Sequence, residues 1–185
     1  MATQVLSSSA ASGADPFPIN GTDYVEFICG NAKQASHYYR SAFGFQLVGY
    51  CGPETGFRDR SSYLLVQDRV RFLLTSALGP DSPIAEHHRR HGDGVRDLAL
   101  WVDDCRQAFG YAVAHGAVAV LEPRVERDEH GEVVLAAIRT YGDTIHSLVE
   151  RRSYRGLFLP GFQPVTPRYR TFFLAGFPFD RTTDV

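Results

Sequence analysis

The sequence predicts an α+β fold made of two tandem βαβββ modules, and a repeated pattern carries that prediction. Residues 23–50 and 95–121 each indicate a strand, a helix and a second strand, in the same order. The spacing from helix-capping residue to terminating glycine is 13 residues in both copies (44−31 and 116−103). Two further strand-like runs follow each copy. An internal repeat of this kind, offset by 72 residues (116−44), indicates a duplicated unit.

The first unit has clear helix boundaries. Asn31 begins the helix, because its side-chain oxygen can accept a hydrogen bond from a free amide one turn on. Gly44 ends it, because glycine enters the left-handed conformation without steric cost. After a turn-rich loop, residues 61–66 and 70–76 predict a hairpin around the polar turn at 67–69. The apolar positions of the helix recur at helical spacing and predict one buried face: Ala32, Ala35, Tyr38, Tyr39, Ala42 and Phe43.

The second unit repeats this order after a polar joint, in which Ile84–His91 predicts two helical turns. Either Asp103 or Asp104 caps its helix, and Gly116 ends it. The elements expected here are a strand at 95–102, a helix at 105–115, and strands at 117–121, 133–140 and 144–151.

Composition shifts divide the chain into five parts. The small-residue start predicts a flexible segment, and the glycine- and proline-rich stretch from Ser153 predicts a linker laid over a surface. Phe172, Phe173, Phe177 and Phe179 lack clean periodicity and belong either to the core or to an exposed association patch. The expected parts are a leader (1–18), a first module (19–78), a connector (79–93), a second module (94–152) and a linker with a divergent tail (153–185).

Charge and composition argue against several classes of protein. A net charge of −2 gives no electrostatic case for binding nucleic acid. No apolar run approaches the ~20 residues that cross a bilayer, and the first 15 residues lack the features of a secretory signal. The three cysteines are odd in number and form no CxxC pair, which indicates buried or free thiols in a reducing cytoplasm.

Several clusters of titratable residues have simpler structural interpretations. His87 and His91 would share a helix face as zinc ligands can, but a polar solvated helix explains the segment. Residues 128–131 are expected to form the charged tip of a hairpin, and residues 141–143 are expected to form a turn. No dinucleotide fingerprint, P-loop or nucleophile elbow is present in the sequence.

Long runs of this sequence resemble the N-terminal half of 4-hydroxyphenylpyruvate dioxygenase, of the vicinal oxygen chelate superfamily, and are close to hydroxymandelate synthase. The runs span residues 15–163 and read GNAKQASHYYRSAFGFQLVGYCGPETG, HGDGVRDLALWVDD, EPRVERDEHGEVVLAAIRTYGDTIHSLVER and YRGLFLPGF. The resemblance implies paired modules that enclose a cup. It also implies iron(II)- and oxygen-dependent conversion of 4-hydroxyphenylpyruvate to homogentisate, in tyrosine breakdown.

In the family, two histidines and a glutamate hold the iron, and they lie in the C-terminal half, which this chain lacks. The residues that separate homogentisate from hydroxymandelate chemistry lie there as well. When the family's ligand pattern is carried onto this half, the two histidine positions correspond to Phe27 and Asp97. The glutamate position corresponds to about Ser147. Only Asp97 could bind iron. The resemblance therefore implies no catalytic, cofactor-binding or metal-binding residue here.

A rearranged site remains an alternative. His37 on the first helix, or His146 beside Glu150 on the final strand, could be recruited as a ligand, although a lone histidine on a strand is more often structural. Glu26 could ligate if its face of the strand lies inside the cup, and the alternation of Tyr24, Glu26 and Ile28 leaves that face open.

Two functions are expected. The first is the non-catalytic half of a 4-hydroxyphenylpyruvate dioxygenase-type protein, here a truncated chain that is inactive alone and self-associates, as family members assemble through this half. The second is a stand-alone, metal-free protein of the same superfamily that binds a small aromatic ligand. Its cup would be lined by Phe27, Tyr63, Phe72 and Trp101, residues that would equally form an ordinary core.

Overall fold

The computed structural model describes residues 15–165 of the 185-residue chain. In chain order its elements are β1 (Ile19–Ile28), α1 (Ala32–Phe43), β2 (Gln46–Cys51), the short 3-10 helix η1 (Pro53–Thr55), β3 (Arg60–Gln67), β4 (Val70–Ala77), α2 (Pro83–His91), β5 (Gly94–Val102), α3 (Cys105–Ala114), β6 (Ala119–Asp128), β7 (Gly131–Arg139), β8 (Ile145–Glu150) and β9 (Gln163–Pro164). None of the helices in the described range is long and apolar enough to cross a membrane.

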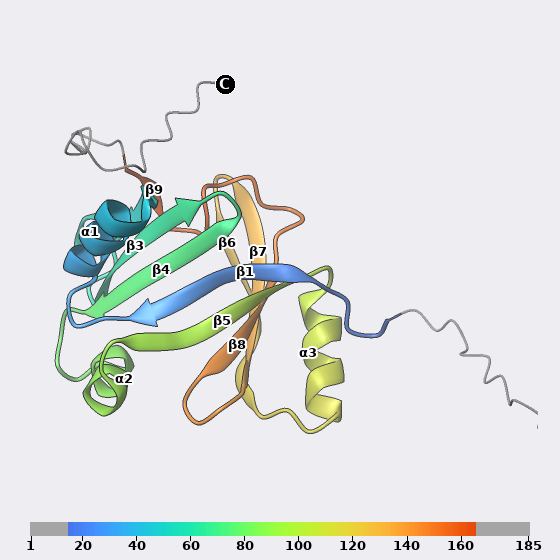
Figure 1. The fold of residues 1–185 in the computed structure, drawn as a ribbon. Helices are drawn as coiled ribbons and strands as arrows, with labels where there is room; N and C mark the ends of the chain where they lie inside the picture. The colour runs from blue at the N-terminus through green and yellow to red at the C-terminus, as the bar shows by residue number, and fades with distance from the viewer. Residues whose placement is uncertain (1–14, 166–185) are drawn as a thin grey trace, which may run out of the picture.

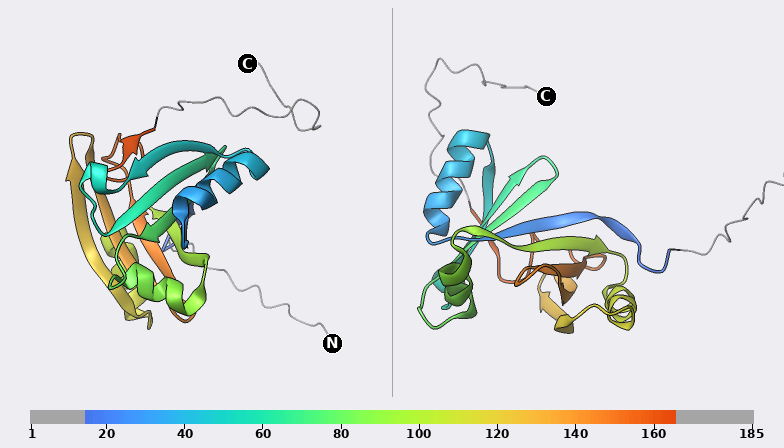
Figure 2. Two further views of the ribbon diagram at one scale, coloured as in Figure 1. Left: turned by 90° about the vertical axis from the view of Figure 1, so that its left-hand side faces the viewer. Right: turned by 60° about the horizontal axis from the view of Figure 1, so that its bottom comes forward.

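Within residues 15–165, all nine strands belong to one mixed sheet, in the order β6-β7-β8-β5-β1-β4-β3-β2-β9. The antiparallel pair β1–β5 lies at its centre, and each of these strands pairs in parallel with the last strand of its own module, β4 or β8. The strand order within the two modules is therefore the same. The predicted α+β fold of two tandem βαβββ modules is confirmed, and Figures 1 and 2 show the sheet strongly curved.

The helix caps follow the predicted chemistry. Asn31 Oδ1 accepts from the Gln34 amide at 3.0 Å, and Gly44 takes a left-handed φ of 76° at the other end of α1. Of the two candidate caps of α3, the structure selects Asp104, whose Oδ1 accepts from the Gln107 amide at 2.8 Å. Both helices therefore begin where a short polar side chain satisfies a free backbone donor.

The predicted buried face of α1 is partly wrong. Ala32 is fully buried, and Ala35 and Tyr39 pack against the sheet, but Tyr38 and Phe43 are 57% and 52% exposed. Tyr38 contacts Phe43 and Tyr39 edge-on, and Phe43 is tilted against Tyr39, at ring-centroid distances of 5.5–5.8 Å. Tyr38 and Phe43 lie on the solvent-exposed side of the helix. Ala42 is exposed as well, so the contact face of α1 is narrower than the predicted stripe.

The hydrophobic core has three parts, one inside the curved sheet and two outside it. Outside, α1 covers β3 and β4, and α3 covers β7 and β8 (Figure 1). The inner cluster joins both modules and comprises Tyr24, Leu64, Leu73, Ala99, Val133, Leu135, Val149, Tyr154 and Phe158.

The segment after β8, predicted to be a surface linker, contributes to this inner cluster. Phe158 is only 2% exposed and meets the Tyr24 ring edge-on at 5.2 Å. The short strand β9 then pairs with β2, although Pro164 lies in it. Glycine and proline here mark tight turns between anchoring aromatic residues. The leader up to residue 14 and the tail phenylalanines Phe172, Phe173, Phe177 and Phe179 lie outside the described residues.

A buried ion pair attaches this segment to the central strand. Arg151 donates from Nε and Nη2 to the two carboxylate oxygens of Asp23, at 2.6 and 2.7 Å, and from Nη1 to the Phe158 carbonyl. Asp23 is 3% exposed, and Arg71 approaches its carboxylate to 3.7 Å. The two-pronged guanidinium contact fixes the position of the chain that carries Phe158.

We expect Asp23→Ala to lower the free energy of unfolding by about 3–5 kcal/mol, because it leaves the Arg151 guanidinium without its buried partner. Urea unfolding followed by circular dichroism measures this loss. Asp59→Ala, which removes an exposed pair with Arg60, serves as the control and should cost less than about 1 kcal/mol. Equal losses for both variants would contradict a structural role for the buried pair.

Candidate functional site

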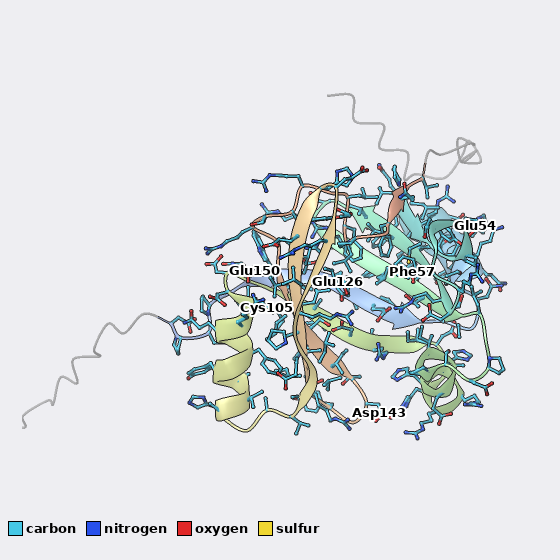
Figure 3. All side chains as sticks on the ribbon, turned by 180° about the vertical axis from the view of Figure 1, so that it is seen from behind. Glu54, Phe57, Cys105, Glu126, Asp143 and Glu150 are labelled. Carbon is cyan, nitrogen blue, oxygen red and sulfur yellow. The ribbon has the colours of Figure 1, made fainter. Side chains whose placement is uncertain are left out.

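The two modules enclose a cup of about 370 Å³ on the inner side of the sheet. Both modules contribute polar groups to its floor and arginines to its rim. Figure 3 looks from behind and labels Phe57, from the loop before β3, and Glu126, from β6, which line it from different modules. Its apolar walls comprise Phe57, Leu73, Val120, Leu121, Leu135, Ala137, Ile145, Leu159, Pro160 and Phe162.

In the second module, Asp97 on β5 forms the floor together with Ser147 on β8. Asp97 Oδ1 accepts from the Ser147 amide at 2.9 Å, and Oδ2 accepts from Ser147 Oγ at 2.5 Å. The Tyr24 hydroxyl, from β1, donates to the same Oδ2 at 3.1 Å. A single buried carboxylate thus joins three neighbouring strands.

In the first module, Glu26 on β1 has the equivalent position. Glu26 Oε1 accepts from Thr75 Oγ1 at 2.8 Å, and Thr75 in turn is 2.9 Å from Ser62 Oγ. The second oxygen, Oε2, lies 3.6 Å from the Arg96 guanidinium. This carboxylate joins β1 to β4 and β3 through hydroxyl groups.

The two hydroxyl–carboxylate pairs are related by the internal duplication. Glu26 and Asp97 are register partners in the central β1–β5 pair. Thr75 and Ser147 are 72 residues apart (147−75), the offset of the sequence repeat. The floor of the cup is therefore the same construction made twice, once in each module.

Burial raises the pKa of both floor carboxyl groups above their ordinary values. Opposing this, hydrogen bonds from Thr75 to Glu26, and from Ser147 and Tyr24 to Asp97, favour the charged form. Burial, with the nearby Asp97 and Glu26 charges, also raises the pKa of Tyr24 well above its usual value. The Tyr24 hydroxyl therefore remains a donor at neutral pH.

The structure corrects the alignment of the expected ligand positions. The inward residue of β1 opposite Asp97 is Glu26, whereas Phe27 lies on the other face, packed against Tyr39 and Phe72. Tyr24 and Glu26 share the inner face of β1, and Phe27 faces the cluster under α1, so the inward position lies one residue earlier than expected. The open question about the face of Glu26 is thus answered, because Glu26 lines the cup.

The donors present on the floor do not fit an iron site. They are two carboxylates and the hydroxyls that contact them or each other, and the carboxylate oxygens already accept hydrogen bonds from neighbouring strands. Iron(II) oxygenase sites take two imidazoles and one carboxylate on the same side of the metal. Within residues 15–165, no three His, Cys, Asp or Glu side chains gather in a way that could hold a metal ion.

The aromatic lining predicted for the cup is wrong. Phe27, Tyr63 and Phe72 belong to the cluster under α1, on the outer side of the sheet. Trp101 is 46% exposed and is not a lining residue. Alternation along the strands could not show which face would be inside, and the aromatic face turned out to be the outer one.

The other candidate ligands have structural roles. Glu150 Oε2 accepts from the Cys105 amide at 2.9 Å at the start of α3, where Figure 3 shows the two residues together. His146 Nδ1 lies 2.8 Å from the Leu98 carbonyl oxygen, and His37 is exposed on α1. None of these three residues lines the cup.

His87 and His91 of α2, the pair considered as zinc ligands, contact each other and the turn between β7 and β8. The rings of His87 and His91 lie 4.6 Å apart, and His91 Nε2 is 3.0 Å from Asp143 Oδ2 in the β7–β8 turn. The hairpin at residues 128–131 is held by Asp128, which accepts from the Tyr154 hydroxyl at 2.8 Å. Both clusters therefore act as connections between elements.

The cysteines offer no nucleophile. All three are buried and unpaired, as the sequence indicated. Burial raises the pKa of Cys29 and of Cys105 to about 12. Their thiols stay protonated at neutral pH.

A duplicated βαβββ unit whose copies enclose a cup defines the vicinal oxygen chelate, or glyoxalase-like, fold. Methylmalonyl-CoA epimerase from Mycobacterium tuberculosis shares this fold with a TM-score of 0.61 at 21% identity, over 75% of this chain and 93% of that chain. At this identity the likeness shows the fold alone.

The chain belongs to the family described as hydroxyphenylpyruvate dioxygenase, N-terminal, which matches residues 14–158. It is 45% identical over 152 residues to 4-hydroxyphenylpyruvate dioxygenase from Caenorhabditis briggsae, covering 82% of this chain. A mutant of 4-hydroxymandelate synthase from Streptomyces coelicolor superimposes with a TM-score of 0.69 at 34% identity, over 72% of this chain and 39% of that chain. This chain spans only 38% of the length of the C. briggsae relative.

The raised pKa values predict how stability depends on pH. The folded protein holds protons on Glu26 and Asp97 at pH values where the unfolded chain has lost them. The contribution of these groups to stability is therefore full below the pKa values of the unfolded chain and is lost as pH rises through the raised folded values. We expect the difference in unfolding free energy, wild type minus Glu26→Gln or Asp97→Asn, to decrease between pH 4 and 8.

Urea unfolding at several pH values measures this difference. Glu132→Gln, which removes an exposed partner of Arg127, is the matched control and should give a flat difference. A difference that stays constant or increases with pH for the floor variants would contradict the assigned direction.

Proposed function

We propose that this chain is the non-catalytic half of a 4-hydroxyphenylpyruvate dioxygenase-type protein and acts as a folded scaffold. Proteins of this type use iron and oxygen to convert 4-hydroxyphenylpyruvate to homogentisate in tyrosine catabolism. Family membership over residues 14–158 supports the assignment to the N-terminal half. In this proposal, the chain alone has no oxygenase activity.

One observation carries the proposal. At the positions where this fold places metal ligands, Glu26 and Asp97 are engaged with Thr75 and Ser147 across the strands. A carboxylate that accepts three hydrogen bonds from its own sheet, as Asp97 does, stabilises the scaffold and has little capacity left for a metal. With no imidazole beside it, the floor lacks the donor set of a ferrous oxygenase.

The proposal extends to assembly and location. Scaffold halves of this family self-associate, and we propose a homo-oligomer in the cytoplasm. The exposed aromatic pair Tyr38 and Phe43 on α1 supports self-association. The three free, buried cysteines support a reducing cytoplasm. Size-exclusion chromatography with light scattering measures the oligomeric state directly.

The purified chain, supplied with iron(II), ascorbate and 4-hydroxyphenylpyruvate in air, should form no homogentisate above the level of a protein-free control. The reason is that the part of the chain that the structure describes brings no iron-binding donor set together in the cup. Chromatographic quantification of homogentisate is the readout. The full-length C. briggsae dioxygenase, assayed in parallel, verifies that the conditions support turnover. Turnover by this chain within an order of magnitude of that enzyme would refute the scaffold assignment.

A second candidate function is metal-free binding of a small aromatic ligand. The observation that favours it is the cup itself, whose 370 Å³ and mixed apolar and polar lining are typical of small-molecule sites. The two functions are compatible, because a scaffold half can retain a ligand pocket.

A further inference from the structure

The start of β1 carries a dipeptide whose chemistry the cup and the scaffold do not use. The sequence has two asparagines, Asn20 and Asn31, and both are exposed. Asn20 precedes Gly21, whereas Asn31 precedes Ala32. A backbone amide nitrogen can attack the side-chain carbonyl carbon of the asparagine before it, and glycine allows the closest approach because it has no Cβ. Asn20 is therefore suited to this reaction, and Asn31 provides an internal comparison.

The sheet is irregular and open where Asn20 lies. The β1–β5 register shifts between Ile19 and Gly21, so Asn20 is an extra residue without a register partner on β5. Within the described residues, β1 pairs with β4 only over Val25–Ile28, so the start of β1 has a strand on one side only. Gly21 has a φ of 142°, and no atom lies within 4 Å of the place where a Cβ would stand. The backbone at this bulge thus has room to move toward the asparagine side chain.

The side-chain amide of Asn20 also has a structural contact. Its Nδ2 donates to Asp103 Oδ1 at 3.0 Å, and the Arg152 guanidinium lies 2.9 Å from the same oxygen. The contact with Arg152, followed by the one with Asn20, lowers the pKa of Asp103 below its ordinary value. Asp103 is therefore a carboxylate at neutral pH. This carboxylate joins the start of β1 to the loop before α3 and to the segment after β8.

Anchoring of the chain before β1 lies next to this contact. Phe17 packs against the cluster under α3, and its ring stacks on Tyr111 at a centroid distance of 6.3 Å. Figure 1 shows the start of β1 beside α3. The Asn20–Asp103 hydrogen bond and the Phe17 contact thus hold the same short stretch of chain.

We propose that Asn20 is a site of spontaneous deamidation in the folded chain. The Gly21 amide nitrogen loses its proton and forms a bond to Asn20 Cγ, the Cγ–Nδ2 bond breaks, and that nitrogen leaves as ammonia. Water then opens the resulting cyclic imide at either carbonyl, which gives aspartate or isoaspartate. The net reaction consumes one water and releases one ammonia, and no group is oxidised or reduced. The proposal is independent of the scaffold assignment and of ligand binding in the cup.

The modification reverses the polarity of the contact. An amide that donates to Asp103 becomes a second carboxylate beside it, and the two like charges share the single Arg152 guanidinium. An isoaspartate also adds a methylene group to the backbone, which disturbs the pairing of the first residues of β1. Deamidation therefore releases the start of β1, with Phe17, from α3 and from the loop before it.

Incubation of the purified, folded full chain in mildly alkaline buffer tests the reaction. Cleavage after Glu26 separates the two asparagines into different peptides. Mass spectrometry and enzymatic methylation of isoaspartate then quantify each product. We expect Asn20 to convert at least about tenfold faster than Asn31, because Ala32 carries a Cβ and is fully buried. Conversion should be slower in mildly acidic buffer, since the attacking nitrogen must lose a proton.

Two variants test the structural consequence. Asn20→Asp introduces the product charge directly, whereas Asn20→Gln keeps an amide donor and cannot close the same ring. Amide hydrogen exchange over residues 19–22 should increase severalfold in the incubated wild type and in fresh Asn20→Asp. It should stay unchanged in incubated Asn20→Gln, the matched control. Thermal unfolding of each variant verifies that the fold is retained.

Three results would count against the proposal. Equal conversion of Asn20 and Asn31 would show that the Asn20–Gly21 bulge has no special reactivity. Conversion of Asn20 only after unfolding in urea would show that the folded backbone prevents the reaction. Conversion without any increase in exchange over residues 19–22 would overturn the release of the start of β1.

Discussion

The hydrogen bonds between carboxylates and hydroxyls on the floor of the cup are the constraint on which the rest of this structure depends. Glu26–Thr75 and Asp97–Ser147 each join the first strand of a module to its last strand. Because β1 and β5 are themselves paired, the two contacts hold four central strands in one register. Two acidic side chains can be buried inside a sheet only when they are satisfied in this way.

The same arrangement defines what the protein can do. A fold that encloses a cup places its inward side chains where a metal could be held, yet here these positions serve cohesion. The Asp23–Arg151 pair and Phe158 complete the inner core from the far end of the described chain. Scaffold and cup are thus built from the same strands.

Much of the fold could be predicted from local signals. Asn31 and Gly44 fixed α1, and the polar turn at 67–69 fixed the β3–β4 hairpin, because capping and turn chemistry act within a few residues. The site depended on long-range information. Whether Glu26 or Phe27 faces inward depends on which face of the sheet α1 covers, and alternation along a single strand does not reveal that. Phe158 likewise lies in a glycine- and proline-rich segment whose burial depends on the distant partner of Arg151, Asp23.

The most direct test is the amount of iron(II) that the chain retains after anaerobic loading and exhaustive dialysis, measured by elemental analysis. If the floor carboxylates are held by their own strands, retained iron should be far below one ion per chain and the same for wild type and Asp97→Asn. One iron per chain in the wild type that is lost in Asp97→Asn would show that these side chains bind a metal. That result would contradict the conclusion that the floor carboxylates serve to hold the strands together.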